Sequence, residues 1–380
     1  MIDDKTSAKI KASNIPYPAH GGNPRAMSDF AEVDPLIDFS ASINPLVPPG
    51  CISQLLLETP RLLREYPDPH CLAITENISR ATGIPKDWIR VTNGSTEMIY
   101  LLPHLLNEGQ EVAIIDPCFS EYEKAFTAFG FKSQSIPLSP DKLFNAEPSH
   151  IFPCLDAIKQ LGAVVIGHPA SPTGKLYGHF LPQLQEYCEK RNVILIIDEA
   201  FIDFSSSYNS ALKLLNKNLI LIRSLTKFYA IPGLRIGYGI LHPEKIKRVD
   251  SYQYPWSVNA LAQAVGAEVI FDSDFQKKTR DWTIRERTFM FEGLNSMHDI
   301  EAFSSEANFL LFRIRDNSAR LDQQLYQHLL SQSLLIRNCG NFKGLDESFF
   351  RISLRERGDN QNLLDSIHDF FSIRQRDFNQ

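Results

Sequence analysis

Short apolar runs alternate with longer segments of mixed polarity along the middle of the chain. Four runs are continuous enough to predict buried strands: Val112–Ile115, Val164–Gly167, Val193–Ile197 and Leu219–Ile222. Between several of them lie segments with helical spacing, such as Glu97–Leu106 and Phe180–Arg191. Strands without polar alternation are typical of a parallel sheet that is covered by helices. The pattern therefore predicts an α/β fold.

The two ends of the chain depart from this alternation. The first fifty residues are rich in proline and have little periodicity. We expect this arm to lie across another surface, because Ile37, Phe39 and Ile43 would otherwise be exposed. Beyond about residue 245 the pattern predicts two helical segments and two strands, with a helix after each strand. These segments are Asn259–Phe271, Trp282–Leu294, Phe309–Ile314 and Phe350–Leu354.

The change of pattern suggests three parts. We expect an N-terminal arm over residues 1–50, which covers the active site and belongs with the small domain. A large domain should follow over 51–270, and a small α+β domain over 271–380.

Composition indicates a folded protein without a strong charge. The 39 Lys and Arg residues are outnumbered by 45 Asp and Glu residues, so no basic excess favours nucleic acid or anionic lipid as a partner. The cysteines are scattered and form no Cys-x-x-Cys pair, which predicts reduced thiols and no metal site. No apolar run approaches the ~18 residues of a membrane span. With a polar N-terminus, this predicts no membrane partner and a cytoplasmic location.

Two carboxylates follow the apolar run Val193–Ile197. Asp198 and Glu199 stand at its C-terminal end, which is where open α/β sheets place their ligands. Asp198 is therefore a candidate for chemistry. A helix cap or a solvated turn is the alternative, because Asp is common in turns.

A lysine follows the next predicted strand. Lys227 lies among apolar and aromatic residues, where burial would disfavour its charged form. A desolvated lysine is what Schiff-base chemistry requires. Ser224 and Arg235 flank it, and a hydroxyl with a permanent cation suits a bound phosphate. A surface lysine is the usual alternative, but it does not account for these neighbours.

A third candidate stands at the start of a predicted helix. Gly94, Ser95 and Thr96 would offer free backbone N–H groups and hydroxyls to an anion there, although Ser and Thr are also ordinary N-cap residues. A phosphate cup, a Schiff-base lysine and a carboxylate are together the groups that pyridoxal phosphate requires.

In the order of these motifs the chain resembles the fold-type I pyridoxal-phosphate enzymes of the class I/II aminotransferase superfamily. Within that group it is most similar to the L-threonine-O-3-phosphate decarboxylases of cobamide synthesis, which are relatives of histidinol-phosphate aminotransferase. The motifs are His20-Gly21-Gly22-Asn23, Asp38-Phe39-Ser40, Ile43-Asn44-Pro45, Asp198-Glu199-Ala200-Phe201 and Pro255-Trp256-Ser257-Val258-Asn259-Ala260. The resemblance implies a large domain with a mostly parallel seven-stranded sheet, a small α+β domain, pyridoxal 5′-phosphate as cofactor, and a homodimer with shared active sites.

The resemblance also implies roles for individual residues. Lys227 should carry the cofactor as a Schiff base, Asp198 should pair with the ring N–H, and Phe119 should stack on the ring. Ser171 stands where the family usually has an asparagine that donates to the cofactor 3′-oxygen, and Phe201 stands where many members have a tyrosine. The cofactor phosphate should be held by Gly94, Ser95, Thr96, Ser224 and Arg235, and by Tyr66 of the neighbouring subunit.

Substrate groups are implied in the same way. Arg351 matches the arginine that binds a substrate anion, usually the carboxylate, and Arg337 is a second cation, with a surface ion pair as its alternative. His20 and Asn23 match arm positions that fold over the substrate. The implied reaction is decarboxylation of O-phospho-L-threonine or O-phospho-L-serine. Its product would be (R)-1-amino-2-propanol phosphate or ethanolamine phosphate, the linker of the cobamide (vitamin B12) nucleotide loop.

Two other functions stay open. The same residues would transaminate if the Cα–H bond, rather than the Cα–carboxylate bond, stood perpendicular to the cofactor ring, so a histidinol-phosphate-type aminotransferase is the alternative. A non-catalytic cofactor-binding regulator is more remote, because it should carry a DNA-binding domain or lack the lysine.

Overall fold

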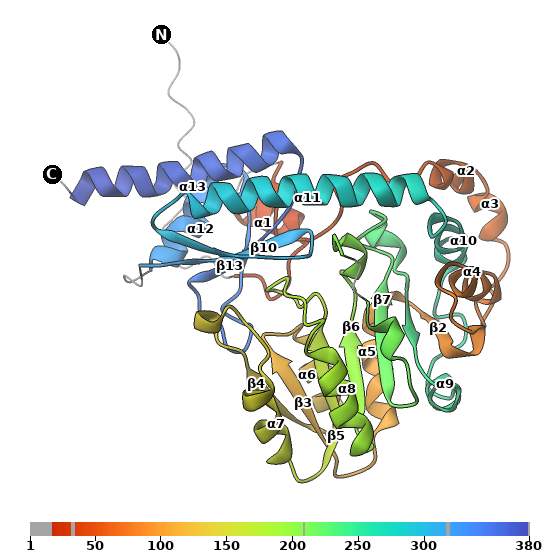
Figure 1. The fold of residues 1–380 in the computed structure, drawn as a ribbon. Helices are drawn as coiled ribbons and strands as arrows, with labels where there is room; N and C mark the ends of the chain where they lie inside the picture. The colour runs from red at the N-terminus through yellow and green to blue at the C-terminus, as the bar shows by residue number, and fades with distance from the viewer. Residues whose placement is uncertain (1–16, 32–34, 208–209, 317–319, 379–380) are drawn as a thin grey trace.

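Seven strands form one large sheet. The computed structural model describes residues 17–31, 35–207, 210–316 and 320–378 (Figure 1). The sheet has the order β2-β8-β7-β6-β5-β3-β4, and β8 alone runs opposite to the other strands of this sheet. The strands are β2 (Ile89–Thr92), β3 (Glu111–Asp116), β4 (Lys132–Pro137), β5 (Leu161–Gly167), β6 (Ile194–Asp198), β7 (Leu219–Ser224) and β8 (Gly237–Ile240). The four predicted strands are confirmed as β3, β5, β6 and β7, which are neighbours in the middle of the sheet.

The central strands lack polar alternation because both faces of the sheet are covered. In β6, Ile194 and Ile196 enter the core on one face, whereas Leu195 and Ile197 enter the core on the other. Side chains on both faces are therefore shielded from water, which accounts for the continuous apolar run. The first core contains side chains from α5 (Gly94–Leu101), α6 (Glu121–Ala128) and α9 (Pro243–Asp250). The second contains side chains from α4 (Leu72–Thr82), α7 (Pro148–Asp156), α8 (Leu181–Lys190) and α10 (Ala260–Val269).

The helix predicted over Glu97–Leu106 differs in its bounds. It begins earlier, at Gly94, and α5 ends at Leu101, where the 3₁₀ turn η2 (Leu102–Leu105) follows. Pro103 causes this change, because it lacks the amide hydrogen that a continued α-helix would need.

A second, antiparallel sheet has the order β12-β13-β10-β9. Its strands are β9 (Ile300–Phe303), β10 (Phe309–Ile314), β12 (Arg337–Asn338) and β13 (Phe349–Ser353). The helices α11 (Ser273–Asn295), α12 (Leu321–Ser331) and α13 (Arg357–Phe378) share one apolar core with it. The strand predicted over Phe309–Ile314 has the observed bounds, and the strand predicted over Phe350–Leu354 lies one residue earlier.

The long helix α11 joins the two sheets. It contacts η4 (Ile202–Phe204) beside the large sheet as well as β9 and β10, and Figure 1 shows it spanning both parts. The segment predicted over Trp282–Leu294 is only its C-terminal part, because its first turns are mostly polar. We keep the division at residue 270 as a proposal, which assigns α11 to the small domain.

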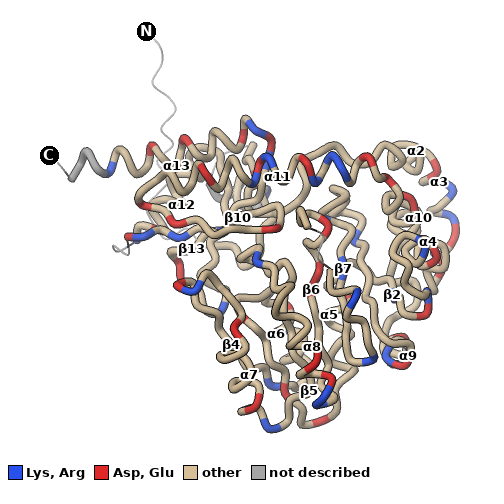
Figure 2. The backbone as a smooth tube through the Cα atoms, viewed as in Figure 1, with Lys and Arg blue, Asp and Glu red and all other residues tan. Residues whose placement is uncertain are grey.

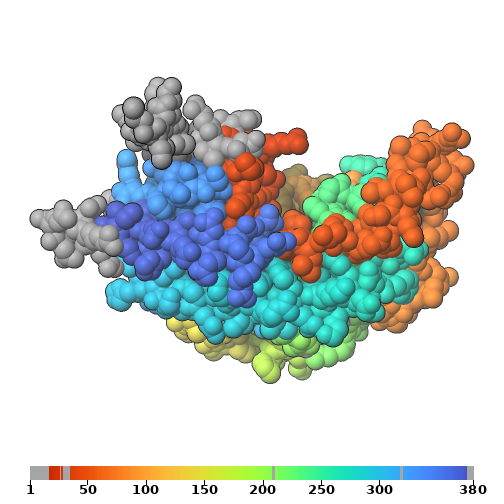
Figure 3. Space-filling model, turned by 90° about the horizontal axis from the view of Figure 1, so that it is seen from above, coloured from red at the N-terminus to blue at the C-terminus, as the bar shows by residue number. Residues whose placement is uncertain are grey.

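The N-terminal arm packs on the small sheet. After α1 (Pro24–Ala31), strand β1 (Ile37–Asp38) pairs in parallel with β11 (Leu334–Leu335). Phe39 is fully buried, and its carbonyl accepts from the Ser353 N–H at 2.8 Å. Figure 3 shows the red and orange N-terminal segment against the blue C-terminal surface. It continues to α2 (Cys51–Leu57) and α3 (Thr59–Leu62), which pack on α10. The first sixteen residues of the predicted arm lie outside the described residues.

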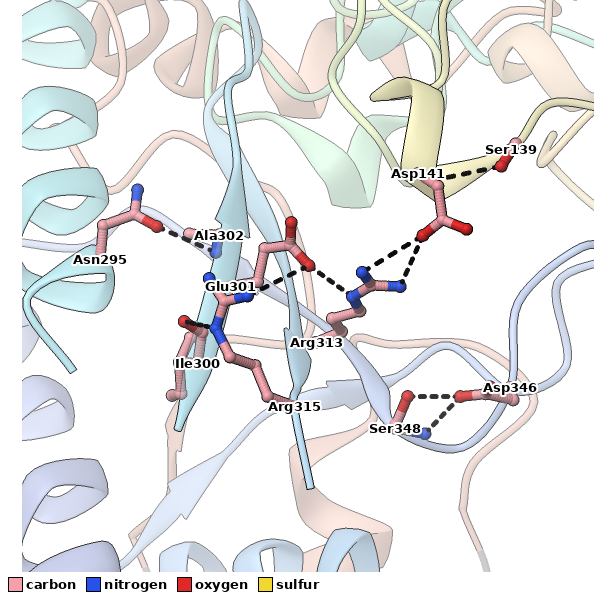
Figure 4. Close-up of polar contacts among 10 residues, drawn as sticks. All are labelled: Ser139, Asp141, Asn295, Ile300, Glu301, Ala302, Arg313, Arg315, Asp346 and Ser348. Atoms are coloured by element: carbon pink, nitrogen blue, oxygen red, sulfur yellow. Dashed lines mark hydrogen bonds and ion pairs between the residues drawn. The ribbon is translucent and has the colours of Figure 1, made fainter. Parts of the chain in front are cut away.

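An ion pair also joins the small sheet to the turn that follows β4 of the large sheet. Arg313 of β10 pairs with Glu301 of β9, and its Nη2 lies 3.4 Å from Asp141 Oδ1 in η3 (Pro140–Lys142). Figure 4 shows this guanidinium between the two carboxylates. Figure 2 shows basic and acidic positions interspersed along the outer helices. Within the described ranges, no helix is long and apolar enough to cross a membrane.

Candidate active site

A cavity of about 320 Å³ lies at the C-terminal ends of the parallel strands, under the small sheet. Gly167 ends β5, Asp198 ends β6, and Lys227 follows β7 in its wall. This edge of a parallel sheet is where α/β proteins bind ligands. The predicted site residues that line the cavity are His20, Ser95, Thr96, Phe119, Ser171, Asp198, Lys227, Arg235, Arg337 and Arg351.

Lys227 has an amine with a lowered pKa. Burial lowers the pKa of its amine to about 8, and the cations Arg235 and Arg351 act in the same direction, while Asp198 opposes them. Its Nζ lies 4.8 Å from the centroid of the Phe201 ring. A lysine with this pKa holds a substantial neutral fraction near pH 8, and the neutral amine is the form that attacks a carbonyl carbon.

Asp198 supplies the negative charge of the site. Its Oδ1 accepts from the Ala200 N–H at 2.9 Å. Burial raises the pKa of Asp198, whereas that hydrogen bond and the nearby Lys227 lower it. The carboxylate can therefore hold a proton-bearing ring nitrogen at the bottom of the cavity.

Behind these two groups lies a buried ion pair. Arg223 Nε is 2.7 Å from Glu199 Oε2, and both side chains are almost completely buried. Glu199 directly follows Asp198, and Arg223 directly precedes Ser224. The pair therefore fastens the ends of β6 and β7 to each other on the side away from the cavity.

The start of α5 and Arg235 form a cradle for an anion. Gly94 has φ +72°, and a Cβ at this position would lie 2.6 Å from Arg235 Nη2. The first N–H groups of α5 have no partner within the helix, and Ser95 and Thr96 add hydroxyls. Ser224 does not line the cavity, but its Oγ lies 2.8 Å from the Thr226 hydroxyl, which does.

Two arginines meet across the small sheet above this cradle. Arg337 of β12 and Arg351 of β13 are directly opposite each other in the antiparallel register. Like charges in this arrangement are destabilising, and both guanidinium groups line the cavity. Burial lowers the pKa of Arg351 to about 10, and Arg337 adds to this effect, so both stay charged at neutral pH. The pair therefore favours ligands with two anionic groups.

Each arginine is held by oxygen atoms of the protein. Arg351 Nη1 donates to Ser171 Oγ at 3.0 Å, and Nη2 donates to the Ser40 carbonyl at 2.9 Å. Arg337 Nη1 and Nη2 donate to the carbonyls of Pro18 and Ala19 in the arm, both at 2.6 Å. Ser171 thus contacts Arg351, a contact that we did not predict.

Besides Ser224, three predicted residues are not among those that line this cavity: Gly94, Asn23 and Tyr66. Asn23 is exposed at the start of α1. Tyr66 is 80% exposed, and its ring packs at a tilt against Trp256, with ring centroids 4.8 Å apart. For Tyr66 this position agrees with a role in a neighbouring subunit.

Several lining residues were not predicted. Thr226 directly precedes Lys227 and repeats the hydroxyl of Ser224 two residues away, a spacing that could have indicated it. Ser40 belongs to a motif that carries the family resemblance, but nothing local indicated that its carbonyl would hold an arginine. Phe342 lies 5.6 Å under the Arg337 guanidinium and has no sequence signal.

A family model described as aminotransferase class I and II matches residues 34–367. The chain belongs to this family. It is 34% identical over 361 residues to a threonine-phosphate decarboxylase of Salmonella typhimurium, which covers 92% of this chain and 96% of that protein. The structure of L-threonine-O-3-phosphate decarboxylase from Porphyromonas gingivalis is 25% identical, with a TM-score of 0.74 over 88% of this chain and 99% of that chain. Histidinol-phosphate aminotransferase from Clostridium acetobutylicum is 31% identical, with a TM-score of 0.79 over 87% and 98%.

These likenesses confirm the predicted fold-type I architecture and pyridoxal 5′-phosphate as the cofactor. The residues present fit that cofactor. The cradle between Gly94 and Arg235 is open only because Gly94 has no Cβ, and it lies in the same cavity wall as Lys227 and Asp198.

We expect Gly94→Ala to weaken binding of pyridoxal 5′-phosphate about tenfold or more, because the new Cβ would displace Arg235 from the cradle. Titration of the cofactor-free protein, followed by absorbance, measures this. Gly83→Ala is the matched control: Gly83 also has a positive φ, +75°, but nothing lies within 4 Å of its added Cβ. Equal cofactor affinity in the two variants would contradict the cradle.

We also expect covalent attachment of the cofactor to depend on pH through Lys227. The rate should rise with pH and level off above a midpoint of about 8, because the neutral amine is the reactive form. An ordinary lysine would give a midpoint about two units higher, near ~10.4. Stopped-flow absorbance of the cofactor-free protein between pH 6.5 and 10 measures the profile, and Lys227→Ala should abolish the signal.

Proposed function

We propose that this protein decarboxylates an O-phosphorylated amino acid, O-phospho-L-threonine or O-phospho-L-serine. The product is (R)-1-amino-2-propanol phosphate or ethanolamine phosphate, for the nucleotide loop of a cobamide. The observation that carries this proposal is the pair Arg337 and Arg351, which face one cavity together with Lys227. A substrate with a carboxylate and a phosphate matches both cations. The likeness to the decarboxylases of Salmonella typhimurium and Porphyromonas gingivalis supports the same chemistry.

The cofactor residues divide into three groups in this proposal. Lys227 holds the cofactor covalently, and Asp198 pairs with the ring nitrogen. Phe119 covers the ring, and Ser171 donates to the 3′-oxygen through its hydroxyl hydrogen. The phosphate is held by Gly94, Ser95, Thr96, Ser224 and Arg235. When bound, pyridoxal 5′-phosphate draws electrons from the bonds at the substrate Cα.

Orientation selects the bond that breaks. Arg351 is fixed by Ser171 and the Ser40 carbonyl, so a carboxylate paired with it has one position relative to the strand ends. Next to it, the charge of Arg337 and the ring of His20 attract the phosphate. Once CO₂ has left, Lys227 in its protonated form donates a proton to Cα, because it lies in the cavity wall and its pKa of about 8 leaves it largely protonated near neutral pH.

The likeness to histidinol-phosphate aminotransferase supports a second candidate function, transamination of a phosphorylated amine. It would use the same residues with a different bond held perpendicular to the ring. A non-catalytic regulator is the least favoured function, because Lys227 stands in the cavity beside Asp198.

We expect the loaded protein to release CO₂ and a phosphorylated amine from O-phospho-L-threonine or O-phospho-L-serine. Trapped CO₂ and mass spectrometry of the amine measure the reaction. Arg351→Met should reduce kcat/KM by about a hundredfold or more, because the carboxylate of the bound substrate would lose its charged partner. Amino transfer to a 2-oxo acid without CO₂ would identify the aminotransferase instead.

We further propose that two copies form a dimer with shared sites. Large apolar side chains stay exposed on neighbouring helices that pack on α10, and on the segment before it. They include Leu56, Leu57, Leu63, Leu72, Tyr254 and Trp256, with Tyr66 packed against the last. An exposed apolar surface of this kind is typical of a protein interface. In the dimer Tyr66 reaches the cofactor phosphate of the other copy.

A mixing experiment tests the shared site. Lys227→Ala and Tyr66→Ala should each have little activity alone, but their equimolar mixture, refolded together, should recover about a quarter of wild-type activity. Half of the dimers are then mixed, and one of their two sites has both residues intact. No recovery, with mixed dimers shown by native mass spectrometry, would argue that each site is built from one chain.

A further inference from the structure

The arm is fastened to the small sheet through its backbone. Arg337 Nη2 donates to the Ala19 carbonyl at 2.6 Å, and the Gly22 N–H donates to Ser40 Oγ at 2.9 Å. These bonds lie on either side of His20 in the sequence, so they set the position of its Cα. They do not set the direction of its ring.

The His20 ring is held by the large part of the molecule instead. Its Nε2 lies 3.1 Å from Glu121 Oε1 and 3.3 Å from Lys124 Nζ, and both residues belong to α6. The ring stands edge-on to Phe119, with centroids 6.1 Å apart. Glu121 Oε1 also accepts from Lys124 Nζ at 2.7 Å, and Glu121 Oε2 accepts from the Tyr100 hydroxyl at 2.9 Å. Two donors therefore hold the Glu121 carboxylate in place independently of its contact with the imidazole.

Glu121 is suited to orient a ring and not to bind the substrate. Burial raises the pKa of Glu121, but the hydrogen bonds from Lys124 and Tyr100 outweigh it and leave this pKa below its usual range. An ionised carboxylate can only accept, so the contact with Glu121 requires a hydrogen on His20 Nε2, and the Lys124 ammonium then donates to Glu121 rather than to that nitrogen. A ring that also donates to a phosphate through Nδ1 carries hydrogen on both nitrogens. His20 lines the cavity, whereas Glu121 is not among the described residues that do.

We propose that Glu121 is a positioning residue for substrate recognition, which holds the His20 ring at the cavity so that the ring contacts the phosphate group. The inference rests on the proposed function, which supplies the phosphate. Glu121 acts from α6 of the large part, whereas Arg337 acts from the small sheet. The phosphate is thus recognised by His20, which is held in place by both the large part of the molecule and the small sheet.

Binding of ethanolamine phosphate to the loaded, full-length protein tests this, because this ligand carries the phosphate but no carboxylate to lose. We expect His20→Ala and Glu121→Ala each to weaken its binding about tenfold by calorimetry. The double variant should bind no more weakly than either single variant, since both remove the same contact. Glu121→Gln should keep most of the affinity, because its amide oxygen still accepts from Nε2. In turnover, Glu121→Ala should raise KM for the phosphorylated substrate and leave kcat unchanged.

The control is Glu123→Ala. Glu123 lies on the same helix as Glu121, but its carboxylate pairs with Lys343 instead of His20. It should leave the affinity unchanged. Additive losses in the double variant, or tighter binding in both Glu121 variants through removal of a repulsive charge, would overturn the inference. If the wild-type protein binds ethanolamine phosphate but releases no CO₂ from either phosphorylated amino acid, the proposed reaction fails while this cycle still decides the role of Glu121.

Discussion

The buried ion pair between Glu199 and Arg223 holds together the two strand ends on which the site depends. Breaking such a pair by removing one partner costs about 3–5 kcal/mol, because the other charge stays buried without compensation. The Glu199 carboxylate also accepts from the Ala211 N–H at 2.7 Å and from Ser210 Oγ at 3.0 Å, so its charge is well satisfied. Successive residues of a strand point to opposite faces. Fixing Glu199 and Arg223 on one side therefore fixes Asp198 and Ser224 on the other.

The small sheet adds a constraint of the opposite kind. Arg337 and Arg351 are cross-strand neighbours, and protein oxygens hold them, with no carboxylate among the hydrogen-bond acceptors found within the described part of the chain. Neutral acceptors satisfy the N–H groups without cancelling the charge. Four protein oxygens take the terminal N–H groups of Arg337, whereas Arg351 Nε has no hydrogen-bond partner among the described residues. Arg351 can therefore donate to a ligand, while Arg337 acts through its charge, and their unfavourable proximity is relieved when two anionic groups enter the cavity. Compared with a site that had only one of these two arginines, the empty site is less stable, and its preference for ligands with two anionic groups is stronger.

Much of the fold could be predicted because it follows from local rules. The strands β3, β5, β6 and β7 are apolar throughout, since both faces are covered. One of the boundaries that were missed has a local cause, because Pro103 ends α5. The other is tertiary: the first half of α11 is mostly polar, and the helix packs on η4 as well as on β9 and β10. Lys227 and Asp198 were predicted from their places after strands, and Arg235 from its place beside Lys227. The role of the Ser40 carbonyl had no such signal, because any residue has a carbonyl.

By itself, the amino-acid sequence determined the alternation of elements, the residue types for cofactor chemistry and their order along the chain. These depend on side-chain identity and on spacing over a few residues, which the sequence records directly. Only the tertiary structure decided which groups face each other across hundreds of residues. It placed Arg337 opposite Arg351, put Ser171 beside Arg351, and brought Glu121 of α6 to the imidazole of His20. Such contacts depend on how two sheets and an arm pack together, and packing is a property of the whole chain.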